Sequence, residues 1–458
     1  MATQTGMAAL ASALKGRLVQ RGGDGYDAAR EVFNAMIDRH PAAIAYCADT
    51  ADVVHALNFA REQGLLLAVR GGGHNGGGLG TCDDGLVIDL SGLKTIAVDA
   101  ASRTVQVGGG CLWREVDAAT AAHGLAVPSG IIGSTGVGGL TLGGGIGHLT
   151  RKHGLTIDNL MAAEVVLADG QVVQASADSH PDLFWGLRGG GGNFGIVTRF
   201  TFRAHPVSGV VAGPTFWPLD QAPAVMAWYN NFIRSAPEEL NGFFALMKVP
   251  PVEPYPAALH LQTVCGIVWC HVGTPEQAER DLAPVRAFGP PMIDGLQPMP
   301  FAALQGAFDG FYTPGLQWYW RADFVNTLDA AAIAGHMRHA QTMPTLHSMM
   351  HLYPINGAAG RVGQADTPFA YRDATWAKVI VGVSPDAADG PRISAWCKDY
   401  WDELHPHSAG GAYVNFMMDE GSARVAASYR GNFVRLAAVK RRYDPGNLFR
   451  MNQNIVPA

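Results

Sequence analysis

A histidine stands inside a glycine run whose backbone could bind an anion. The run Arg70-Gly-Gly-Gly-His-Asn-Gly76 follows a short apolar segment and contains the spacing G-x-G-x-x-G. A dinucleotide-binding βαβ unit requires a helix to open at this run, but further glycines follow here, and then another apolar segment. Consecutive glycines can still turn their N–H groups toward one concavity, which suits a diphosphate without any lysine. We therefore interpret residues 70–76 as a backbone cradle in which His74 has a functional role.

A second and longer glycine-rich run extends over residues 130–147. Its glycines would let the backbone approach a flat or phosphorylated ligand closely, and Ser134 and Thr135 can donate hydroxyl hydrogen bonds. No G-K-[ST] sequence follows either run, which argues against a P-loop. A third run, at residues 189–192, precedes a strand. Glycine runs that lead directly into apolar strands are not flexible linkers.

Short strands and helices must position these runs. Before Pro206 the apolar pattern predicts strands at 65–70, 86–90, 104–107, 160–167, 171–175 and 196–202, and helices that start at Thr50, span 112–123 and span 181–187. Asp169-Gly170 lies between two of these strands and predicts a β-hairpin.

After Pro206 strands and helices alternate without glycine-rich turns, which predicts an antiparallel sheet covered by helices. The expected strands are 243–247, 259–272, 348–353 and 377–383, with an aromatic segment at 315–321, and the expected helices are 224–235, 275–288, 327–342 and 390–404. We predict an N-terminal part of one domain at 1–206, an inserted domain at 207–405, and a segment at 406–458 that returns to the first domain.

Composition excludes several classes of protein. The 458 residues carry a formal charge of -6 and no strongly basic block, so we expect no nucleic-acid partner and no membrane partner. No run approaches the ~20 apolar residues of a membrane-spanning helix. The six cysteines form no C-x-x-C pair and no apolar signal segment opens the chain, so we expect no metal site, no disulfide framework and a cytoplasmic location.

Several motifs together resemble the berberine bridge enzyme-like group of FAD-linked oxidases, within the vanillyl-alcohol oxidase superfamily. They are Arg70-Gly-Gly-Gly-His74, Gly143-Gly-Gly-Ile-Gly147 with Arg151-Lys-His-Gly-Leu155 and Asp158-Asn159, Trp185-Gly-Leu-Arg-Gly-Gly-Gly-Gly-Asn-Phe-Gly-Ile-Val197, and the tail Arg442-Tyr-Asp-Pro-Gly-Asn-Leu-Phe449 with Asn452-Gln-Asn-Ile455. The resemblance covers nearly the whole chain. It implies an α+β fold, with a PCMH-type FAD-binding domain built from both chain ends and a substrate domain inserted between them.

The resemblance also implies that His74 carries FAD covalently through the 8α-methyl group. Doubly linked members add a cysteinyl bond from a position that is Ile132 here, so we expect no second link. The residues expected to bind the cofactor are His74, Arg70, Gly71, Gly72, Gly73, Asn75, Ser134, Thr135, Gly138, Gly139, Gly143, Gly147, Asn159, Gly195, Ile196, Val197, Asn452 and Asn454.

The catalytic base is less obvious. Many alcohol-oxidising relatives carry a tyrosine where this chain has Phe416, and phenylalanine cannot take a proton. Our candidates on the inserted sheet are Tyr319, Arg321, His351 and Tyr353, and we favour His351 or Tyr353 as the base. These two share a strand face because side chains alternate with a period of two.

The sequence therefore predicts an enzyme that dehydrogenates an alcohol, or less readily an amine, of a small to medium and apolar or aromatic substrate. Hydride would pass to FAD and then to dioxygen or another electron acceptor. The missing base at Phe416 keeps one alternative open, namely a flavin-dependent cyclase or isomerase without net oxidation.

Overall fold

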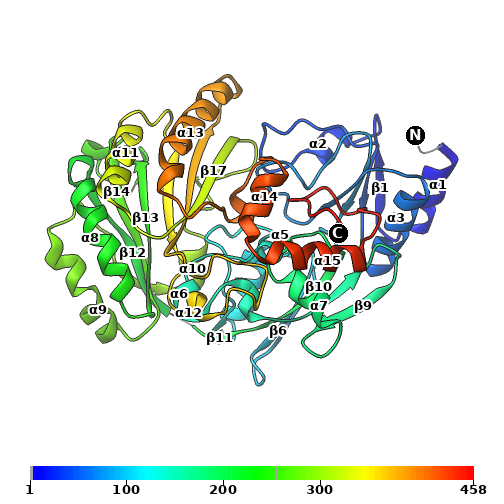
Figure 1. Cartoon of the computed structure of the whole chain (residues 1–458), viewed down its shortest axis with the longest axis horizontal. Helices are drawn as coiled ribbons and strands as arrows, with labels where there is room; N and C mark the ends of the chain where they lie inside the picture. The colour runs from blue at the N-terminus through cyan, green and yellow to red at the C-terminus, as the bar shows by residue number, and fades with distance from the viewer. Residues whose placement is uncertain (1–3, 208, 254) are drawn as a thin grey trace.

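The computed structural model describes residues 4–207, 209–253 and 255–458. Figure 1 shows two halves side by side: the N-terminal sheets on the right, and a large sheet with its covering helices on the left. The C-terminal segment lies across the middle and reaches the N-terminal half. Each half contains both helices and sheets, and the two largest sheets are antiparallel, which confirms the α+β expectation.

The N-terminal half contains two main sheets. The first has the order β1-β2-β4-β3, built from β1 (Arg17–Gln20), β2 (Ala43–Tyr46), β4 (Leu86–Asp89) and β3 (Leu67–Arg70). The second is antiparallel with the order β5-β6-β10-β8-β9, built from β5 (Ile96–Asp99), β6 (Thr104–Gly108), β10 (Ile196–Arg203), β8 (Leu160–Val166) and β9 (Val172–Ser176). The short strands β7 (Leu125–Ala126) and β11 (His205–Pro206) form a separate pair. In the first sheet β4 runs parallel to β2 and β3, so the carboxyl end of β3 delivers the first glycine run to one edge.

The other half is one eight-stranded antiparallel sheet. Its strands are β12 (Gly209–Pro218), β13 (Leu240–Lys248), β14 (Thr263–His271), β15 (Ile293–Asp294), β16 (Gln297–Pro300), β17 (Gln317–Val325), β18 (Met349–Pro354) and β19 (Trp376–Ser384). The path runs β15-β12-β14-β13-β18-β19-β17, and β16 pairs with β12.

The two faces of this sheet have different partners because neighbouring side chains point to opposite sides. Met350 and Ile380 belong to the core under helices α8 (Ala222–Ser235), α9 (Pro275–Phe288), α11 (Ala330–Gln341) and α13 (Gly390–Leu404). Their neighbours Met349 and Val379 belong to the core shared with the N-terminal half. We call the face that carries Met349 and Val379 the inner face; it packs against the N-terminal half, which contains the glycine runs.

The remaining helices are mostly short and join these layers. They are α1 (Gln4–Ala13), α2 (Tyr26–Arg30), α3 (Thr50–Glu62), α4 (Trp113–Ala121), α5 (Val137–Gly143), α6 (Thr150–His153), α7 (Pro181–Leu187), α10 (Phe301–Gln305), α12 (Ala358–Arg361), α14 (Ser422–Tyr429) and α15 (Asn432–Tyr443). No helix among the described residues is long and apolar enough to cross a membrane.

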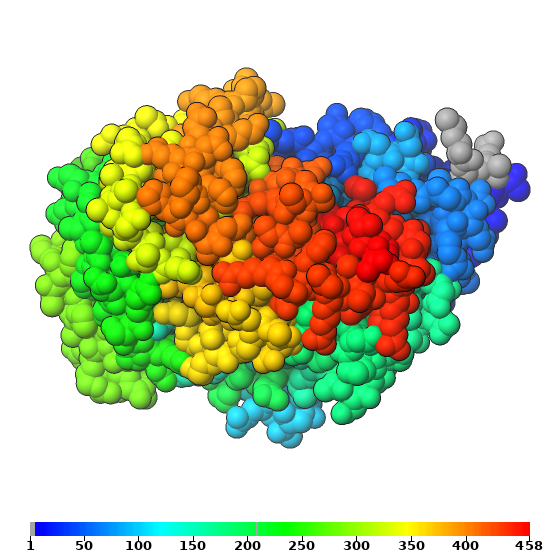
Figure 2. Space-filling model, viewed as in Figure 1, coloured from blue at the N-terminus to red at the C-terminus, as the bar shows by residue number. Residues whose placement is uncertain are grey.

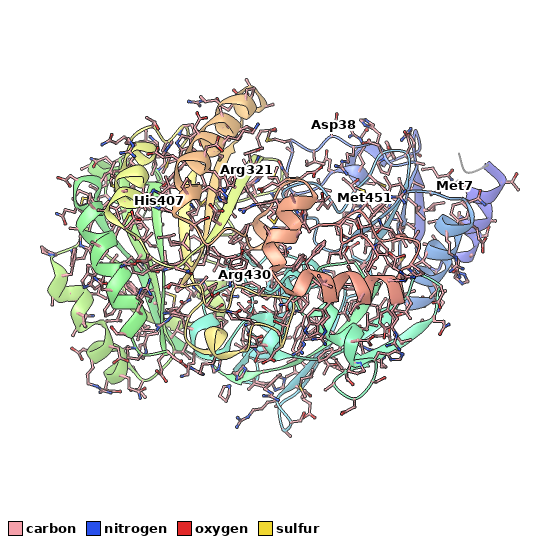
Figure 3. All side chains as sticks on the ribbon, viewed as in Figure 1. Met7, Asp38, Arg321, His407, Arg430 and Met451 are labelled. Carbon is pink, nitrogen blue, oxygen red and sulfur yellow. The ribbon has the colours of Figure 1, made fainter. Side chains whose placement is uncertain are left out.

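Buried charges attach the C-terminal segment to both halves. On the sheet side, Arg321 on β17 pairs with Glu420 at 2.8 Å, and Figure 3 shows Arg321 beside this strand. On the N-terminal side, Lys440 on α15 is buried; it pairs with Asp444 at 2.7 Å and donates to the carbonyl oxygen of Asn193 at 2.8 Å. The orange-to-red atoms of this segment accordingly lie between the two halves in Figure 2.

Most of the predicted elements are present, and the errors lie at their ends. The hairpin around Asp169-Gly170 and the helix at 181–187 are confirmed. The strand predicted at 259–272 begins only at Thr263, because a 3-10 turn at Ala257–Leu259 and a left-handed Leu261 precede it. The helix predicted from 327 begins at Ala330, where the Asp329 side chain accepts the hydrogen bond of Ala332 N–H.

Candidate functional site

A cavity of about 360 Å³ lies between the N-terminal sheets and the inner face of the eight-stranded sheet. Its walls are the glycine runs, strands β17 to β19 and the C-terminal segment. Of the residues predicted for the site, the following line the cavity: His74, Arg70, Gly71, Gly72, Gly73, Asn75, Thr135, Gly138, Gly139, Gly195, Ile196, Val197, Asn452, His351 and Tyr353. Met451 also lines it and packs against the first sheet, in the position labelled in Figure 3.

The imidazole of His74 is held on two sides. Its Nε2 hydrogen-bonds Ser134 Oγ at 3.1 Å, and the ring of Phe33 stacks on it with centroids 3.9 Å apart and planes 20° apart. Burial lowers the pKa of His74 to about 4, and the backbone of Ser134 offsets only part of that effect. The ring is therefore neutral at physiological pH and has the lone pair that a nucleophile needs.

The first two glycine runs touch through their backbones. A Cβ placed on Gly72 would lie 2.4 Å from the nitrogen of Gly136, and one on Gly136 would lie 2.3 Å from the nitrogen of Gly72. Gly73 has a positive φ of 71°. Glycine is needed here because the approach leaves no room for a side chain, and it brings Ser134 and His74 from separate loops into contact.

Arg70 lines the cavity, but its guanidinium is already engaged below the loop. Nε donates to Asp89 Oδ2 at 2.5 Å, and a terminal nitrogen donates to the carbonyl oxygen of Ala29 at 2.8 Å. Among the described residues that line the cavity there is no other cation and no carboxylate. An anionic ligand would therefore have to be bound by backbone N–H groups, as the glycine content predicts.

The eight-stranded sheet contributes an aromatic and apolar wall. Its members in the lining are Trp318, Trp320, Met349, His351, Tyr353, Val379 and Val381. Trp320 packs directly on the first glycine run, because a Cβ on Gly76 would lie 2.9 Å from its ring. Tyr312 lines the same space and contacts Trp318 with ring centroids 5.5 Å apart.

Two polar side chains in this wall form a buried pair. Nδ1 of His351 and the hydroxyl of Tyr353 are 2.7 Å apart. Burial lowers the pKa of His351 to about 3 and raises the pKa of Tyr353 well above its ordinary value. At neutral pH both groups are uncharged, so the tyrosine hydroxyl can donate to the imidazole and accept from a substrate hydroxyl.

The C-terminal segment closes the cavity beside this pair. Phe416 lines the cavity and contacts the ring of Tyr353, with centroids 5.6 Å apart. The hydroxyl of Tyr413 accepts from the backbone N–H of Gly145 at 2.8 Å and from Asn415 Nδ2 at 2.7 Å. Tyr413 thereby fixes this segment to the second glycine run.

Six of the predicted residues do not line the cavity. Ser134 reaches it indirectly, through His74. Gly143 and Gly147 lie in tight backbone packing behind it: a Cβ would meet Asn415 at 2.1 Å in the first case and the Ser129 carbonyl oxygen at 2.0 Å in the second. The other three are Asn159, Asn454 and Tyr319.

Asn159 donates to the carbonyl oxygens of His153 and Leu155 and pairs with His205, so it ties a loop to β11. Tyr319 packs against the helix-covered core on the other face of β17, under the guanidinium of Arg321. A catalytic role for Tyr319 would need it on the inner face, and the period of two that places Trp318 and Trp320 inside places it outside.

Sequence reasoning missed Phe33, Asn34 and Tyr429. Phe33 covers His74, Asn34 hydrogen-bonds the backbone of both Gly76 and Trp318, and Tyr429 lines the cavity. None of them belongs to a glycine run or to a predicted strand of the site. Their positions depend on tertiary packing, which leaves no local pattern.

The site suits an elongated dinucleotide with a flat ring. The first glycine run lines the cavity together with the aromatic wall of the second half. Apolar lining is added by Leu67 on β3, by Leu79 after the first glycine run, and by Phe449 and Met451 of the C-terminal segment. The Oδ1 atom of Asn452 is buried with no hydrogen-bond partner among the described residues and could accept from a ligand hydroxyl or amino group. The Oδ1 atom of Asn454 is likewise unpartnered among these residues, but Asn454 lies outside the cavity lining.

Comparison with known proteins agrees with this geometry. Residues 41–176 match the model of an FAD binding domain, and residues 412–456 match the model described as berberine and berberine like. An FAD-linked oxidoreductase of Dictyostelium discoideum is 33% identical over 93% of this chain and 91% of its own length.

Solved structures give the same picture. The structure of 6-hydroxy-D-nicotine oxidase from Arthrobacter nicotinovorans superposes with a TM-score of 0.87 at 25% identity, covering 97% of this chain and 98% of that one. Glucooligosaccharide oxidase from Acremonium strictum, described with a 6-S-cysteinyl, 8α-N1-histidyl FAD, shares the fold with a TM-score of 0.88 at 23% identity, covering 99% of each chain.

Proposed function

Because the chain belongs to the berberine bridge enzyme-like family of FAD-linked oxidoreductases, we propose that it carries FAD on His74 and dehydrogenates an uncharged, apolar or aromatic alcohol. The observation that carries this proposal is that His74 and the pair His351–Tyr353 line one cavity. The group that would hold the flavin and the group that would take the substrate proton thus face the same space.

The residues present fit FAD. Gly71, Gly72 and Gly73 offer backbone N–H groups to the diphosphate, and Gly138, Gly139 and the segment Gly195–Val197 provide room for the cofactor along the cavity. FAD supplies the two-electron acceptor to which the substrate hydride passes. In this proposal residues 1–206 and 406–458 form the FAD-binding domain, and residues 207–405 form the substrate domain.

A covalent bond from His74 is supported by its neutral and stacked imidazole and by the histidyl FAD named for glucooligosaccharide oxidase. A second, cysteinyl bond is not proposed. The position that would supply it, Ile132, lines the cavity with an aliphatic side chain.

Tyr353 and His351 would move the substrate proton. The hydroxyl of Tyr353 accepts the proton of the substrate hydroxyl and passes its own proton to Nδ1 of His351, which is 2.7 Å away. General-base assistance of this kind typically contributes about 10²–10⁴ in rate. Phe416, which cannot act as a base, packs against Tyr353, and both members of the pair are buried.

The wall composition supports an uncharged substrate. Trp318, Trp320, Met349, Val379 and Val381 offer aromatic and aliphatic contacts, and no described residue of the lining is a carboxylate that could pair with an ammonium group. An amine substrate would have to shed its proton before binding, so we favour an alcohol. Dioxygen or another acceptor would then take the electrons from the flavin.

The alternative is a flavin-dependent cyclase or isomerase that returns the electrons to its product. Phe416 favours this alternative, because a phenylalanine cannot act as the base that net oxidation of an alcohol would need at that position. The pair His351–Tyr353 weighs against it, because it offers a proton acceptor elsewhere in the same cavity.

The experiment has two parts. Acid precipitation of the wild-type protein is expected to leave yellow colour in the pellet, and the His74→Ala variant is expected to release all its flavin. An anaerobic screen then follows flavin bleaching with neutral benzylic alcohols and with their carboxylate and aminomethyl analogues. Bleaching by the neutral alcohols, with stoichiometric reduction of dioxygen or a dye on turnover, supports the proposal; product formation without any reduced acceptor would support the alternative instead.

A further inference from the structure

The environment of His74 distinguishes its two ring nitrogens. Nε2 is hydrogen-bonded to Ser134 Oγ at 3.1 Å, whereas Nδ1 has no side-chain hydrogen-bond partner among the described residues. Phe33 covers one face of the ring and its backbone N–H donates to the carbonyl oxygen of Gly73 at 3.2 Å, so the ring cannot turn freely. The two nitrogens therefore have different chemical roles available to them.

The loop that carries Ser134 is fixed on both sides of that residue. The backbone N–H of Gly133 donates to Asp309 Oδ1 at 2.7 Å. The carbonyl oxygens of Gly133 and Thr135 accept from the backbone N–H groups of Arg114 at 2.8 Å and Trp113 at 2.9 Å. The serine hydroxyl is thus presented to His74 by a rigid backbone and makes no other hydrogen bond among the described residues.

We infer that Ser134 is the positioning residue for attachment of FAD: its hydroxyl holds Nε2–H of His74, so that Nδ1 keeps the lone pair that forms the bond to the flavin. This inference rests on the covalent link proposed above. It adds a residue outside the cavity lining that holds the histidine ring in place while this bond forms.

The chemistry balances without further groups on the protein. The bond between His74 Nδ1 and the 8α carbon forms, and one C–H bond of that methyl group breaks. The imidazole gives up its Nε2 proton, and the two electrons released pass through the flavin to dioxygen or another two-electron acceptor, which takes up both hydrogens.

A hydroxyl suits both stages of this reaction, because it can accept or donate. Before attachment Ser134 Oγ accepts from Nε2–H. Afterwards the substituted ring is neutral and Nε2 has only a lone pair, so the same hydroxyl rotates and donates to it. Alanine offers neither bond, whereas threonine keeps the hydroxyl.

The test measures covalent attachment rather than turnover. Apo-protein is incubated with FAD and dioxygen, and the bound flavin is followed by fluorescence on a denaturing gel and by intact mass. Ser134→Ala is expected to attach FAD about tenfold more slowly than wild type, which is the effect of one lost hydrogen bond. Ser134→Thr keeps the hydroxyl, and the control Ser102→Ala removes the hydroxyl of an exposed serine on the turn between β5 and β6, outside the cavity lining. Both are expected to stay within about threefold of wild type.

Thermal unfolding of each apo-variant shows whether it is folded. Attachment by Ser134→Ala at the wild-type rate would overturn the role of Ser134 while leaving the covalent link intact. A wild-type protein that never retains flavin would instead remove the proposed link itself. Proteolysis of the loaded protein supplies a second readout: a peptide substituted on Nδ1 of His74 is expected, and one substituted on Nε2 would contradict the inference.

Discussion

The side-chain amide of Asn34 pairs with the backbone of Trp318 as a neighbouring strand would. Its Nδ2 donates to the Trp318 carbonyl oxygen at 3.0 Å, and its Oδ1 accepts from the Trp318 N–H at 3.0 Å. The same Nδ2 also donates to the carbonyl oxygen of Gly76 at 2.7 Å. One buried side chain thus couples the loop of His74 to the aromatic wall of the second half.

Replacing Asn34 with aspartate should destabilise the protein. The carboxylate would face the carbonyl oxygens of Gly76 and Trp318 with no proton to donate, and each buried group left unpaired costs about 1–3 kcal/mol. The free energy of unfolding, measured by urea denaturation, is expected to fall by that amount, whereas the exposed control Asn231→Asp should leave it unchanged. Equal stability of the two variants would show that the coupling through Asn34 contributes nothing.

Tyr353→Phe should slow flavin reduction by the substrate about 10²-fold or more, because the proton acceptor is lost. The rate is measured by anaerobic stopped flow at the flavin absorbance. The matched control is Tyr319→Phe on the outer face of β17, which should reduce flavin at the wild-type rate. A larger effect at Tyr319 than at Tyr353 would contradict the arrangement of the wall.

The pH dependence of that rate follows from His351, whose pKa burial lowers to about 3. Its imidazole must be unprotonated to accept a proton, so the rate should be flat near pH 6.5 and fall only as the pH approaches about 3. The rate could instead fall below about pH 6.5, the ordinary pKa of histidine. That profile would show that His351 and Tyr353 are solvated and that another group accepts the substrate proton.

Lys440→Met should be strongly destabilising. The ammonium group is buried against Asp444, and the change leaves that carboxylate uncompensated, which typically costs about 3–5 kcal/mol. Urea denaturation should show this loss, while Arg441→Met one position along on the exposed side should change stability by less than about 0.5 kcal/mol. A loss below about 1 kcal/mol for Lys440→Met would mean that α15 is docked mainly by its apolar contacts.

Asp117 should make stability fall as the pH rises. Burial raises the pKa of this carboxyl to about 7, from an ordinary value of 3.8. Between these two values the folded protein holds a proton that the unfolded chain releases, so stability is greatest below about pH 4, declines toward pH 7 and is level above it. The total change is at most about 4 kcal/mol. Thermal unfolding across this range should lose that slope in Asp117→Asn; an unchanged slope would assign it to other groups.

The sequence predicted the parts of the site that depend on local motifs, namely the glycine runs and the alternation along single strands. Glycine runs identify the cradle because few other structures need several successive residues that have a positive φ or no room for a Cβ. Gly72 and Gly136 show this, because a Cβ on either would collide with the backbone of the other. The pairing of His351 with Tyr353 follows from the period of two. The pattern could not predict that Tyr319 lies on the helix-covered face of β17. Alternation separates the two faces of a strand, but it does not tell which face packs against which neighbour.

Contacts between distant segments were likewise beyond prediction. Asn34 and Trp318 are separated by 284 positions, and nothing in either segment indicates the other. Asn159 has a motif that suggests a ligand, yet its amide is engaged by the loop beside β11. Arg70 also belongs to a motif that suggests a ligand, but its guanidinium pairs with Asp89 instead. Asp89 is 19 positions away, and no sequence pattern indicates this pairing.

The cavity wall begins at Phe33 and is completed only by Gln453. During synthesis a ribosome would therefore release almost the entire polypeptide before a closed compartment exists. The compartment that we propose for FAD is thus complete only after nearly the whole polypeptide has been made, and we expect chains that stop before Tyr413 to lack it.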